Sequence, residues 1–180
     1  MLEDELLKWK LRRGRPEALA RVYEKYIDAM LTLAMGLLSN RAAAEDVVQD
    51  VFLSFARSAR NLRSQGNLRS YLATGVLNRV RDRRRQLYRQ MVNLESVDEP
   101  VCESAGPDQA AILVEQIARL DQAVAELPQE QREVVLLRLK MDLKFRDIAK
   151  LQQTSVNTVL GRYRYGLDRL RSLLNGEVDR

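Results

Sequence analysis

Hydrophobic positions recur every three or four residues through most of this 180-residue chain, which predicts helices. The alternating pattern typical of strands is nearly absent, because even the valines follow helical spacing. Pro16 and Pro128 suit first helical turns, where an amide donor is not needed. The pattern therefore predicts an all-α protein. The expected helices lie near residues 2–12, 16–38, 41–59, 67–89, 108–126, 129–140, 144–152 and 155–174.

Residues 91–107 interrupt this pattern with two prolines, a glycine and four acidic residues. Such a composition is typical of a flexible linker rather than of a packed element. The sequence thus predicts two small helical domains, residues 1–90 and 108–177, joined by an acidic flexible linker, residues 91–107.

Charge is distributed unevenly along the chain. Residues 1–90 hold 18 basic and 10 acidic side chains, whereas residues 91–109 hold five acidic and no basic ones. Two basic segments on either side of an acidic connector suggest two surfaces that face a polyanion. The C-terminal segment, residues 110–180, is the weaker of the two, with 12 basic and 10 acidic residues.

The composition argues against several classes of function. There is no histidine, the usual general base and commonest metal ligand, and Cys102 is the only cysteine. We therefore expect no enzyme activity, no metal site, no cofactor and no internal disulfide. No apolar run is long enough to span a bilayer, and the acidic stretch Glu3–Glu5 does not suit a signal peptide, so a cytoplasmic location is expected.

Residues 143–171 have the pattern of two helices joined by a short turn. Phe145, Ile148 and Ala149 form the apolar face of the first helix, and Ser155 is a suitable N-cap for the second. The apolar stripe of the second helix comprises Val156, Val159, Tyr163, Leu167, Leu170 and Leu174. Its opposite face carries Asn157, Thr158, Arg162, Arg164, Tyr165 and Arg169. This arrangement is typical of a DNA-binding helix-turn-helix, although an ordinary helical hairpin with a solvated arginine face would look similar.

The predicted helix 41–59 has an apolar stripe formed by Val47, Val48, Val51, Phe52 and Phe55. Its other face carries Glu45, Asp46, Gln49 and Asp50 within two turns. Such an acidic ridge could bind a basic protein surface, but charge alone favours a solvated helix face.

A polar loop, residues 61–70, precedes a strongly basic helix. Tyr71, Leu72, Val76, Val80 and Leu87 are expected to face inward. The outer face crowds five arginines into seven residues: Arg79, Arg81, Arg83, Arg84 and Arg85. Only Asp82 offsets their mutual repulsion. Arginines beside polar and aromatic residues suit single-stranded nucleic acid, whose bases stack and whose phosphates pair with cations.

Five blocks, in this order, resemble the extracytoplasmic-function (ECF) group of bacterial RNA polymerase sigma factors, over roughly residues 5–174. Arg13 to Leu19, with Tyr23 and Tyr26, resembles the opening helices of that family, and Ala44 to Leu53 resembles its core-polymerase-binding helix. The promoter-melting helix of the family is similar to the segment here that contains Tyr71-Leu72, Asn78 and the arginine run. Leu120 to Leu139 and Ile148 to Arg162 resemble the two halves of its region four.

The resemblance implies a sigma factor that binds core RNA polymerase and directs promoter-specific initiation. Asp46, Gln49 and Asp50 would bind the clamp helices of the largest subunit, and region four would also contact the polymerase flap. The N-terminal domain (region 2) would melt and recognise the minus-ten element, and the C-terminal domain (region 4) the minus-thirty-five element. The implied DNA-binding residues are Asn61, Arg63, Asn67, Arg69, Asn78, Arg79, Arg83, Ser155, Asn157, Thr158, Arg162, Arg164 and Arg169. An anti-sigma factor is a further expected partner, no membrane partner is expected, and the protein would associate with the nucleoid through polymerase.

Three positions depart from the family pattern. The family usually has tryptophan where Tyr71 stands, a larger aliphatic residue where Gly75 stands, and Leu-Gly where Gln152-Gln153 forms the turn. Gln tolerates a positive φ less well than Gly, so this turn is expected to be the least regular part of the motif.

Two other functions fit parts of the pattern. A free-standing helix-turn-helix regulator would use residues 110–174 alone and bind duplex DNA tightly without polymerase. A helical protein-interaction module would show no salt-dependent affinity for nucleic acid.

Overall fold

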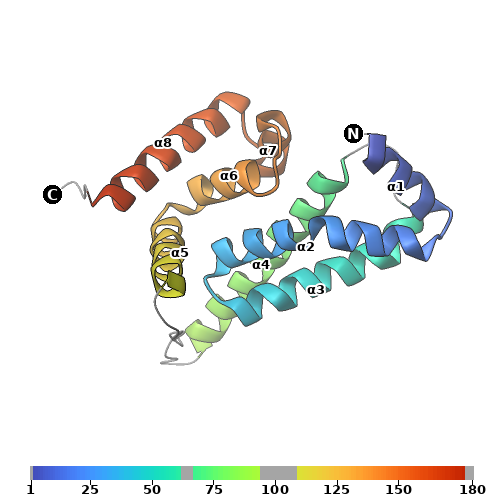
Figure 1. The fold of residues 1–180 in the computed structure, drawn as a ribbon, viewed down its shortest axis with the longest axis horizontal. Helices are drawn as coiled ribbons and strands as arrows, with labels where there is room; N and C mark the ends of the chain where they lie inside the picture. Colours follow the sequence, from blue (N-terminus) through green and yellow to red (C-terminus); the bar gives the residue numbers. More distant parts are fainter. Residues whose placement is uncertain (1, 62–66, 94–108, 177–180) are drawn as a thin grey trace.

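The structure, a computed structural model, describes residues 2–61, 67–93 and 109–176. Over these residues it contains eight α-helices, one short 3-10 helix (η1) and no strand, which confirms the all-α prediction. In chain order the elements are α1 (Leu2–Arg12), α2 (Pro16–Leu38), α3 (Arg41–Ser58), η1 (Ala59–Asn61), α4 (Leu68–Asn93), α5 (Gln109–Ala125), α6 (Gln129–Leu139), α7 (Phe145–Gln152) and α8 (Val156–Asn175) (Figure 1).

Local capping chemistry explains where several helices begin. Pro16 is the first residue of α2, and Asn40 caps α3 by accepting a hydrogen bond from the Ala43 amide at 2.9 Å. The α4 helix continues to Asn93, three residues into the predicted linker. The other linker residues, including Cys102, lie outside the described part of the chain.

Helices α2, α3 and α4 form the N-terminal bundle, and α1 lies across its end (Figure 1). Leu33, Phe55 and Leu72, one from each helix of the bundle, are fully buried. Two residues expected to face inward do not: Tyr71 is 42% exposed and Leu87 is 49% exposed. Tyr71 is on the side of α4 next to a surface pocket. Leu87 lies beyond Val80, the last buried residue among those of α4 whose side chains are described.

Helices α6, α7 and α8 pack around Val134, Ile148 and Val159, which belong to the same continuous hydrophobic core as the N-terminal bundle. The turn before α8 has Gln153 in the left-handed region, with φ 52°, so glutamine occupies the position where glycine is usual. The periodicity places Val156 on the inward stripe, but this residue lies in the first turn of α8 and is 40% exposed.

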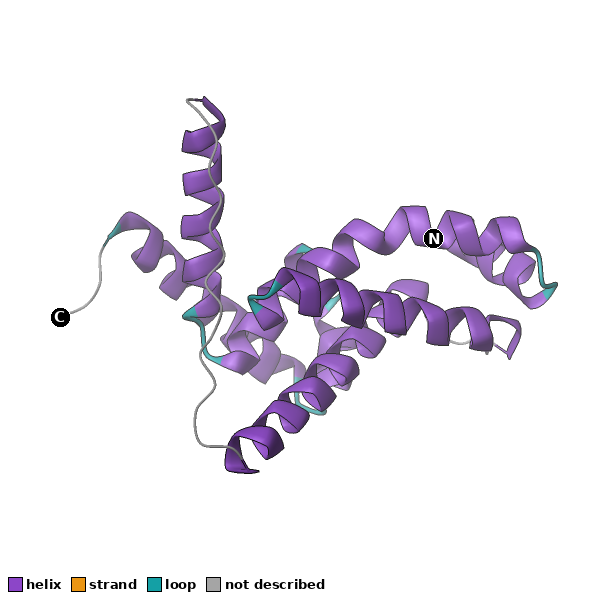
Figure 2. Ribbon diagram, turned by 90° about the horizontal axis from the view of Figure 1, so that it is seen from below, coloured by secondary structure: helices purple, strands orange, loops and turns teal. Residues whose placement is uncertain are grey.

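The two halves touch through α2 and α6, although the sequence predicts a flexible linker between them. The Leu136 side chain of α6 packs on Gly36 of α2 so closely that a Cβ there would lie 2.8 Å from a Leu136 methyl. An ion pair joins Arg81 of α4 to Glu133 of α6 at 3.0 Å. The exposed residues 115–122 of α5, by contrast, lie on a segment that projects away from the bundle (Figure 2).

None of the described helices combines the length and the apolarity needed to cross a bilayer.

Candidate nucleic-acid and protein interfaces

The acidic ridge of α3 lies at the surface, as predicted. Asp46, Gln49 and Asp50 are all exposed, while Val47, Val48 and Val51 on the other side of the helix are buried. The three polar side chains thus form one face that no described helix covers.

An apolar groove between α2 and α3 borders this ridge and has a volume of about 490 Å³. Tyr23 and Phe52 meet edge to face with ring centres 4.8 Å apart, and Leu53 at its rim is 49% exposed. Sequence reasoning missed this groove because it assigned Phe52 to the core. Leu53, four residues after Gln49, was the available signal for an apolar patch on the ridge side. The groove and ridge together form a surface of mixed apolar and acidic character.

A second pocket, of about 330 Å³, lies between α3 and α4. Tyr71, Asn78, Arg79 and Asp82 provide its polar and aromatic walls. The Tyr71 hydroxyl lies 3.0 Å from the Ser58 hydroxyl, which fixes the ring at the rim. An aromatic ring, an amide, a guanidinium group and a carboxylate around one hollow are the groups that stack on an unpaired base and hydrogen-bond its edge.

Gly75 gives this pocket its shape. A Cβ at position 75 would lie 2.7 Å from a methyl carbon of Val51, closer than real side chains approach. The larger residue that is common in the family at this position would therefore need a smaller neighbour than Val51.

The predicted residues around the 61–70 loop have different surroundings. Asn61 is exposed at the end of η1, and Arg63 lies outside the described residues. The Asn67 side chain accepts a hydrogen bond from the Arg69 amide at 3.0 Å and so caps α4. Arg69 pairs with Asp142 of the C-terminal half at 2.7 Å.

The arginine run of α4 does not crowd one solvated face, which corrects the sequence prediction. Arg81 pairs with Glu133, Arg84 donates to the Leu37 carbonyl at 2.6 Å, and Arg83 lies 3.5 Å from Asp46. These partners come from α2, α3 and α6, which periodicity along α4 cannot predict. Arg79, by contrast, is exposed in the wall of the α3–α4 pocket.

The helix-turn-helix brings its predicted residues to one side of α8. The Ser155 hydroxyl accepts from the Thr158 amide at 3.0 Å, which confirms the predicted N-cap. Asn157, Arg164 and Arg169 are exposed, as is Thr158. Arg162 is half-buried and donates to the Gln152 side chain at 2.9 Å.

Two apolar side chains near the start of α8 are exposed, which the sequence pattern did not predict. Val156 is 40% exposed and Leu160 is 42% exposed, one turn apart near the start of α8. Exposed apolar groups at the start of a recognition helix can contact thymine methyl groups in the major groove.

A buried carboxylate connects the two candidate DNA surfaces. Glu133 is 4% exposed and accepts from Arg81, from Gln129 at 3.2 Å and from Gln152 at 3.2 Å. Because Gln152 also accepts from Arg162, one chain of contacts runs from α4 to α8. Buried charge is tolerated where it is paired and hydrogen-bonded, as here.

The described residues contain no cluster of three or more acidic, cysteine or histidine side chains able to hold a metal ion.

Comparisons with known proteins agree with this geometry. Residues 22–90 match the family model of Sigma-70 region 2, and residues 117–169 match that of Sigma-70 region 4. Similar proteins include the ECF RNA polymerase sigma factor RpoE of Cereibacter sphaeroides, 29% identical over 89% of each chain. Another is SigW of Bacillus subtilis, 24% identical over 92% of this chain and 93% of that protein.

Solved structures show the same fold. CnrH in complex with the cytosolic domain of CnrY has a TM-score of 0.72 at 23% identity, and covers 97% of this chain and 99% of that one. RpoE of Bartonella quintana, in complex with the anti-sigma factor NepR, has a TM-score of 0.69 at 23% identity, over 89% and 98% of the two chains. Both domain matches, in the order and arrangement that the structure shows, establish that the chain belongs to the sigma factors of bacterial RNA polymerase, in their extracytoplasmic-function group.

Proposed function

We propose that this sigma factor binds core RNA polymerase through the acidic ridge of α3 and the apolar groove beside it. The observation that supports this is the exposure of Asp46, Gln49 and Asp50 along one ridge of α3, where Gln49 also lines the groove that contains Tyr23 and Leu53. Apolar area supplies affinity, and the acidic rim selects a basic partner and its orientation. The clamp helices of the largest subunit are the proposed partner, with the flap as a second contact for the C-terminal domain.

Promoter DNA is contacted by two separate surfaces in this proposal. The α3–α4 pocket, with Asn78 and Arg79 in its wall, holds an unpaired base of the minus-ten element. The exposed face of α8, with Asn157 and Arg164, contacts the duplex minus-thirty-five element in the major groove. Base capture costs a few kcal/mol of unstacking, which the pocket contacts offset. We accordingly assign minus-ten binding to the domain of residues 1–90 and minus-thirty-five binding to the domain of residues 108–177. Residues 91–107 are the linker between them.

The protein acts as a specificity subunit rather than as an enzyme, in the bacterial cytoplasm and at the nucleoid through polymerase. An anti-sigma factor is a further proposed partner, because two proteins of similar fold form complexes with CnrY and with the anti-sigma factor NepR. The groove beside the acidic ridge is where such a partner would compete with polymerase.

Pull-down with core polymerase tests the proposal. We expect Asp50→Arg to abolish the association while unfolding stability changes by about 0.5 kcal/mol or less, as is usual for surface substitutions. Asp121→Arg is the matched control, because Asp121 is exposed on α5 and forms no ion pair with a described residue. Equal core binding by the two variants would rule out the ridge as the polymerase contact. Run-off transcription with the same variants then distinguishes a loss of polymerase binding from a loss of initiation.

A further inference from the structure

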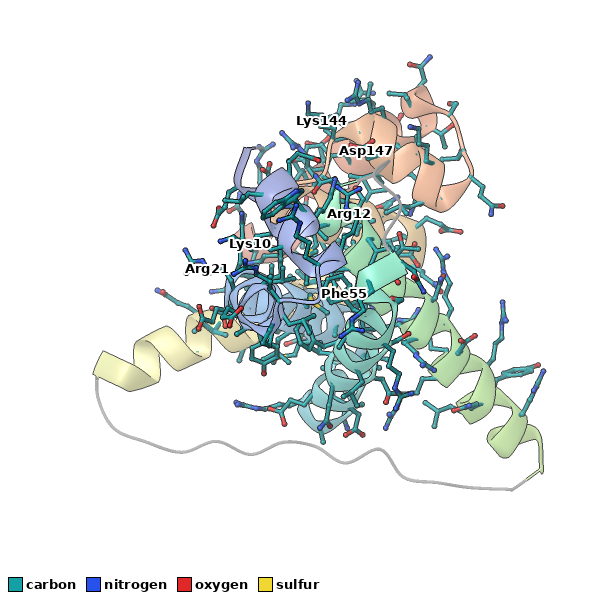
Figure 3. All side chains as sticks on the ribbon, turned by 90° about the vertical axis from the view of Figure 1, so that its right-hand side faces the viewer. Lys10, Arg12, Arg21, Phe55, Lys144 and Asp147 are labelled. Atoms are coloured by element: carbon teal, nitrogen blue, oxygen red, sulfur yellow. The ribbon has the colours of Figure 1, made fainter. Side chains whose placement is uncertain are left out.

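The side chain of Gln152, the last residue of α7, is held at both ends of its amide. Its nitrogen Nε2 donates to the Glu133 carboxylate at 3.2 Å and to the Glu130 carbonyl at 3.3 Å. Its oxygen Oε1 accepts from Nη1 of Arg162 at 2.9 Å. One amide therefore connects α6 with α8. Figure 3 shows the side chains of this part of the molecule, with Lys144 and Asp147 near the start of α7 labelled.

The buried carboxylate of Glu133 decides how this amide is turned. A carboxylate only accepts hydrogen bonds, so the nitrogen of Gln152 faces Glu133 and the oxygen is left for a donor. Glu133 is 4% exposed and is itself fixed by its ion pair with Arg81 at 3.0 Å. The amide oxygen is therefore directed at Arg162 before any DNA is bound.

Glutamine is the residue that suits both neighbours of position 152. The leucine that is usual in the family there can neither donate nor accept, and a glutamate would place a second carboxylate against Glu133. The hydrogen bond to Arg162 thus depends on a position at which this chain departs from the family pattern.

The bond to Gln152 leaves one edge of the Arg162 guanidinium free. It uses Nη1, whereas Nε and Nη2 together form a fork of two parallel donors. Such a fork matches O6 and N7 of guanine in the major groove. An arginine that is held in place before DNA binds loses less side-chain freedom on binding, so its base contact is stronger and more selective.

We propose that Gln152 is a positioning residue that determines the base-pair specificity of α8, because it fixes the Arg162 fork for one guanine. Gln152 acts through Arg162 and does not itself contact the base. The inference rests on the proposed function, in which α8 contacts the duplex minus-thirty-five element.

Nuclear magnetic resonance of the free full-length protein tests the positioning directly. Gln152→Met keeps the length of the side chain but removes its donor and its acceptor. We expect the order parameter of the Arg162 Nε–H bond, measured by nitrogen-15 relaxation, to fall in this variant. Gln129→Met is the matched control, because it removes a different hydrogen bond of Glu133, at 3.2 Å, and should leave the order parameter unchanged. Equal order in Gln152→Met and the wild type would overturn the proposal.

A base-pair scan with the holoenzyme tests the specificity. The probe is a duplex selected by the holoenzyme from a random-sequence pool, and each base pair of its minus-thirty-five element is replaced in turn in gel-shift titrations. Arg162→Ala should abolish the preference for one G·C pair. Gln152→Met should lower the preference at that same pair by about threefold to tenfold, the cost of ordering one long side chain, and leave the other pairs unchanged. Gln129→Met should keep the wild-type preference at every pair.

Three results of the scan would overturn the proposal. An equal loss at every pair in Gln152→Met would show a merely structural role for the amide. A uniform loss in Arg162→Ala would place Arg162 on a phosphate instead of a base. Wild-type preference in Gln152→Leu, a second variant that introduces the residue usual in the family, would show that the amide is not needed.

A double variant identifies the residue through which Gln152 acts. In the Arg162→Ala background, Gln152→Met should change duplex affinity by less than about twofold, because the side chain that it positions is already absent. A loss as large as in the wild-type background would assign the effect to another residue and refute the positioning of Arg162.

Core pull-down of the same proteins distinguishes this inference from the proposed function. Intact core binding by the wild type, with equal Arg162 order in the wild type and Gln152→Met, would refute the inference alone. Lost core binding by the wild type would refute the proposed function alone if the free protein, scanned at low salt on a duplex that it selects itself, still shows the loss at one G·C pair in Gln152→Met.

Discussion

At the scale of single residues, two glycines in helix interiors have opposite surroundings. A Cβ on Gly75 would lie 2.7 Å from Val51, whereas a Cβ on Gly161 of α8 would meet nothing within 4 Å. Alanine in place of glycine stabilises an open helix position by about 0.5–1 kcal/mol, but overpacking a core costs about 1–3 kcal/mol. Gly161→Ala should therefore raise the urea midpoint and Gly75→Ala should lower it.

Val51 provides the control for this prediction. If its methyl group is the obstacle, Val51→Ala should be less harmful in the Gly75→Ala background than in the wild type. Parallel stabilisation by Gly75→Ala and Gly161→Ala would contradict the close approach of α3 and α4. Nothing in the spacing of hydrophobic residues distinguishes these glycines, since the difference depends on which helix lies opposite.

At the scale of elements, substitutions on α8 and on α4 should cause different defects, one in duplex binding and the other in promoter opening. Asn157→Ala and Arg162→Ala should each weaken binding of the minus-thirty-five duplex by about 1–3 kcal/mol, the usual value of a base-edge contact. Arg79→Ala should leave that binding unchanged and reduce promoter opening, visible as weaker permanganate reactivity of thymines in the melted region. Identical defects in both assays would refute the division between the two helices.

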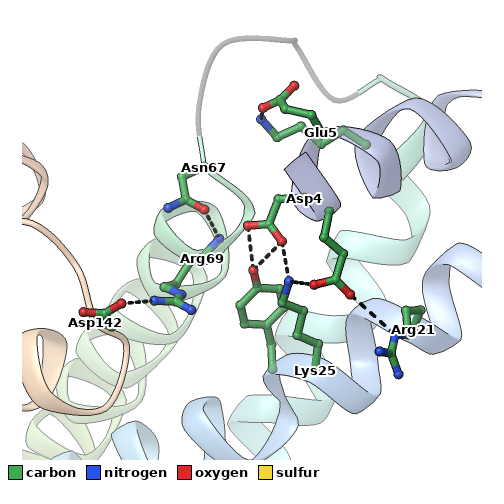
Figure 4. A network of polar contacts seen from close by, with 10 residues as sticks. Asp4, Glu5, Arg21, Lys25, Asn67, Arg69 and Asp142 are labelled. Atoms are coloured by element: carbon green, nitrogen blue, oxygen red, sulfur yellow. Dashed lines mark hydrogen bonds and ion pairs between the residues drawn. The ribbon is translucent and has the colours of Figure 1, made fainter. Parts of the chain in front are cut away.

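The docking of α1 on α2 depends on a polar network that is sensitive to pH (Figure 4). Lys25 donates to Glu3 at 2.6 Å and to Asp4 at 2.8 Å, and the Tyr26 hydroxyl donates to Asp4 at 2.9 Å. Burial raises the pKa of Asp4, but the hydrogen bonds from Lys25 and Tyr26 and the Lys25 charge outweigh it, so the pKa lies below 3.8. Burial, followed by the bond to Asp4, raises the pKa of Tyr26 to about 12.

These shifts give opposite pH dependences. The lowered Asp4 pKa stabilises the fold above pH 3.8, and this contribution is lost as the pH falls through the folded value. The raised Tyr26 pKa stabilises the fold fully below pH 10, and that contribution is lost as the pH rises toward about 12. Asp4→Asn should therefore lower the melting temperature at pH 7, and the difference from the wild type should shrink below pH 3.8. A melting-temperature difference between Asp4→Asn and the wild type that stays constant down to pH 2 would contradict the role of the network. The control variant Asp121→Asn should have the wild-type melting temperature at every pH.

The elements were predictable where the determinants are local. Periodicity and capping placed the helices, the N-cap Ser155 and the exposed ridge of Asp46 and Asp50. The pairing of the arginine run was not predictable, because Glu133 lies 52 residues along the chain from Arg81. The groove beside the ridge was not predictable for a similar reason, because its walls come from two different helices, α2 and α3.

At the scale of the whole molecule, the contact between α2 and α6 fixes the two halves while leaving α8 accessible. Asn157, Thr158, Arg164 and Arg169 remain exposed, so the N-terminal domain does not cover the recognition face. We expect the free protein to bind promoter DNA weakly because its two DNA surfaces are not held at the promoter spacing, and not because α8 is masked. Two linked sites gain affinity only when their geometry lets both engage together.

Gel-shift titrations with and without core polymerase test this view, using a duplex selected by the holoenzyme from a random-sequence pool. We expect binding with core to be tighter than binding by free protein by a factor on the order of 100 or more, since core would hold both DNA surfaces at the promoter spacing. Leu136→Ala, which loosens the contact with Gly36, should change free-protein affinity by less than about twofold, because α8 is already exposed. A large gain from Leu136→Ala would instead show that the closed arrangement masks α8. Nanomolar, sequence-specific binding by the free wild-type protein would favour a free-standing regulator and refute the requirement for core.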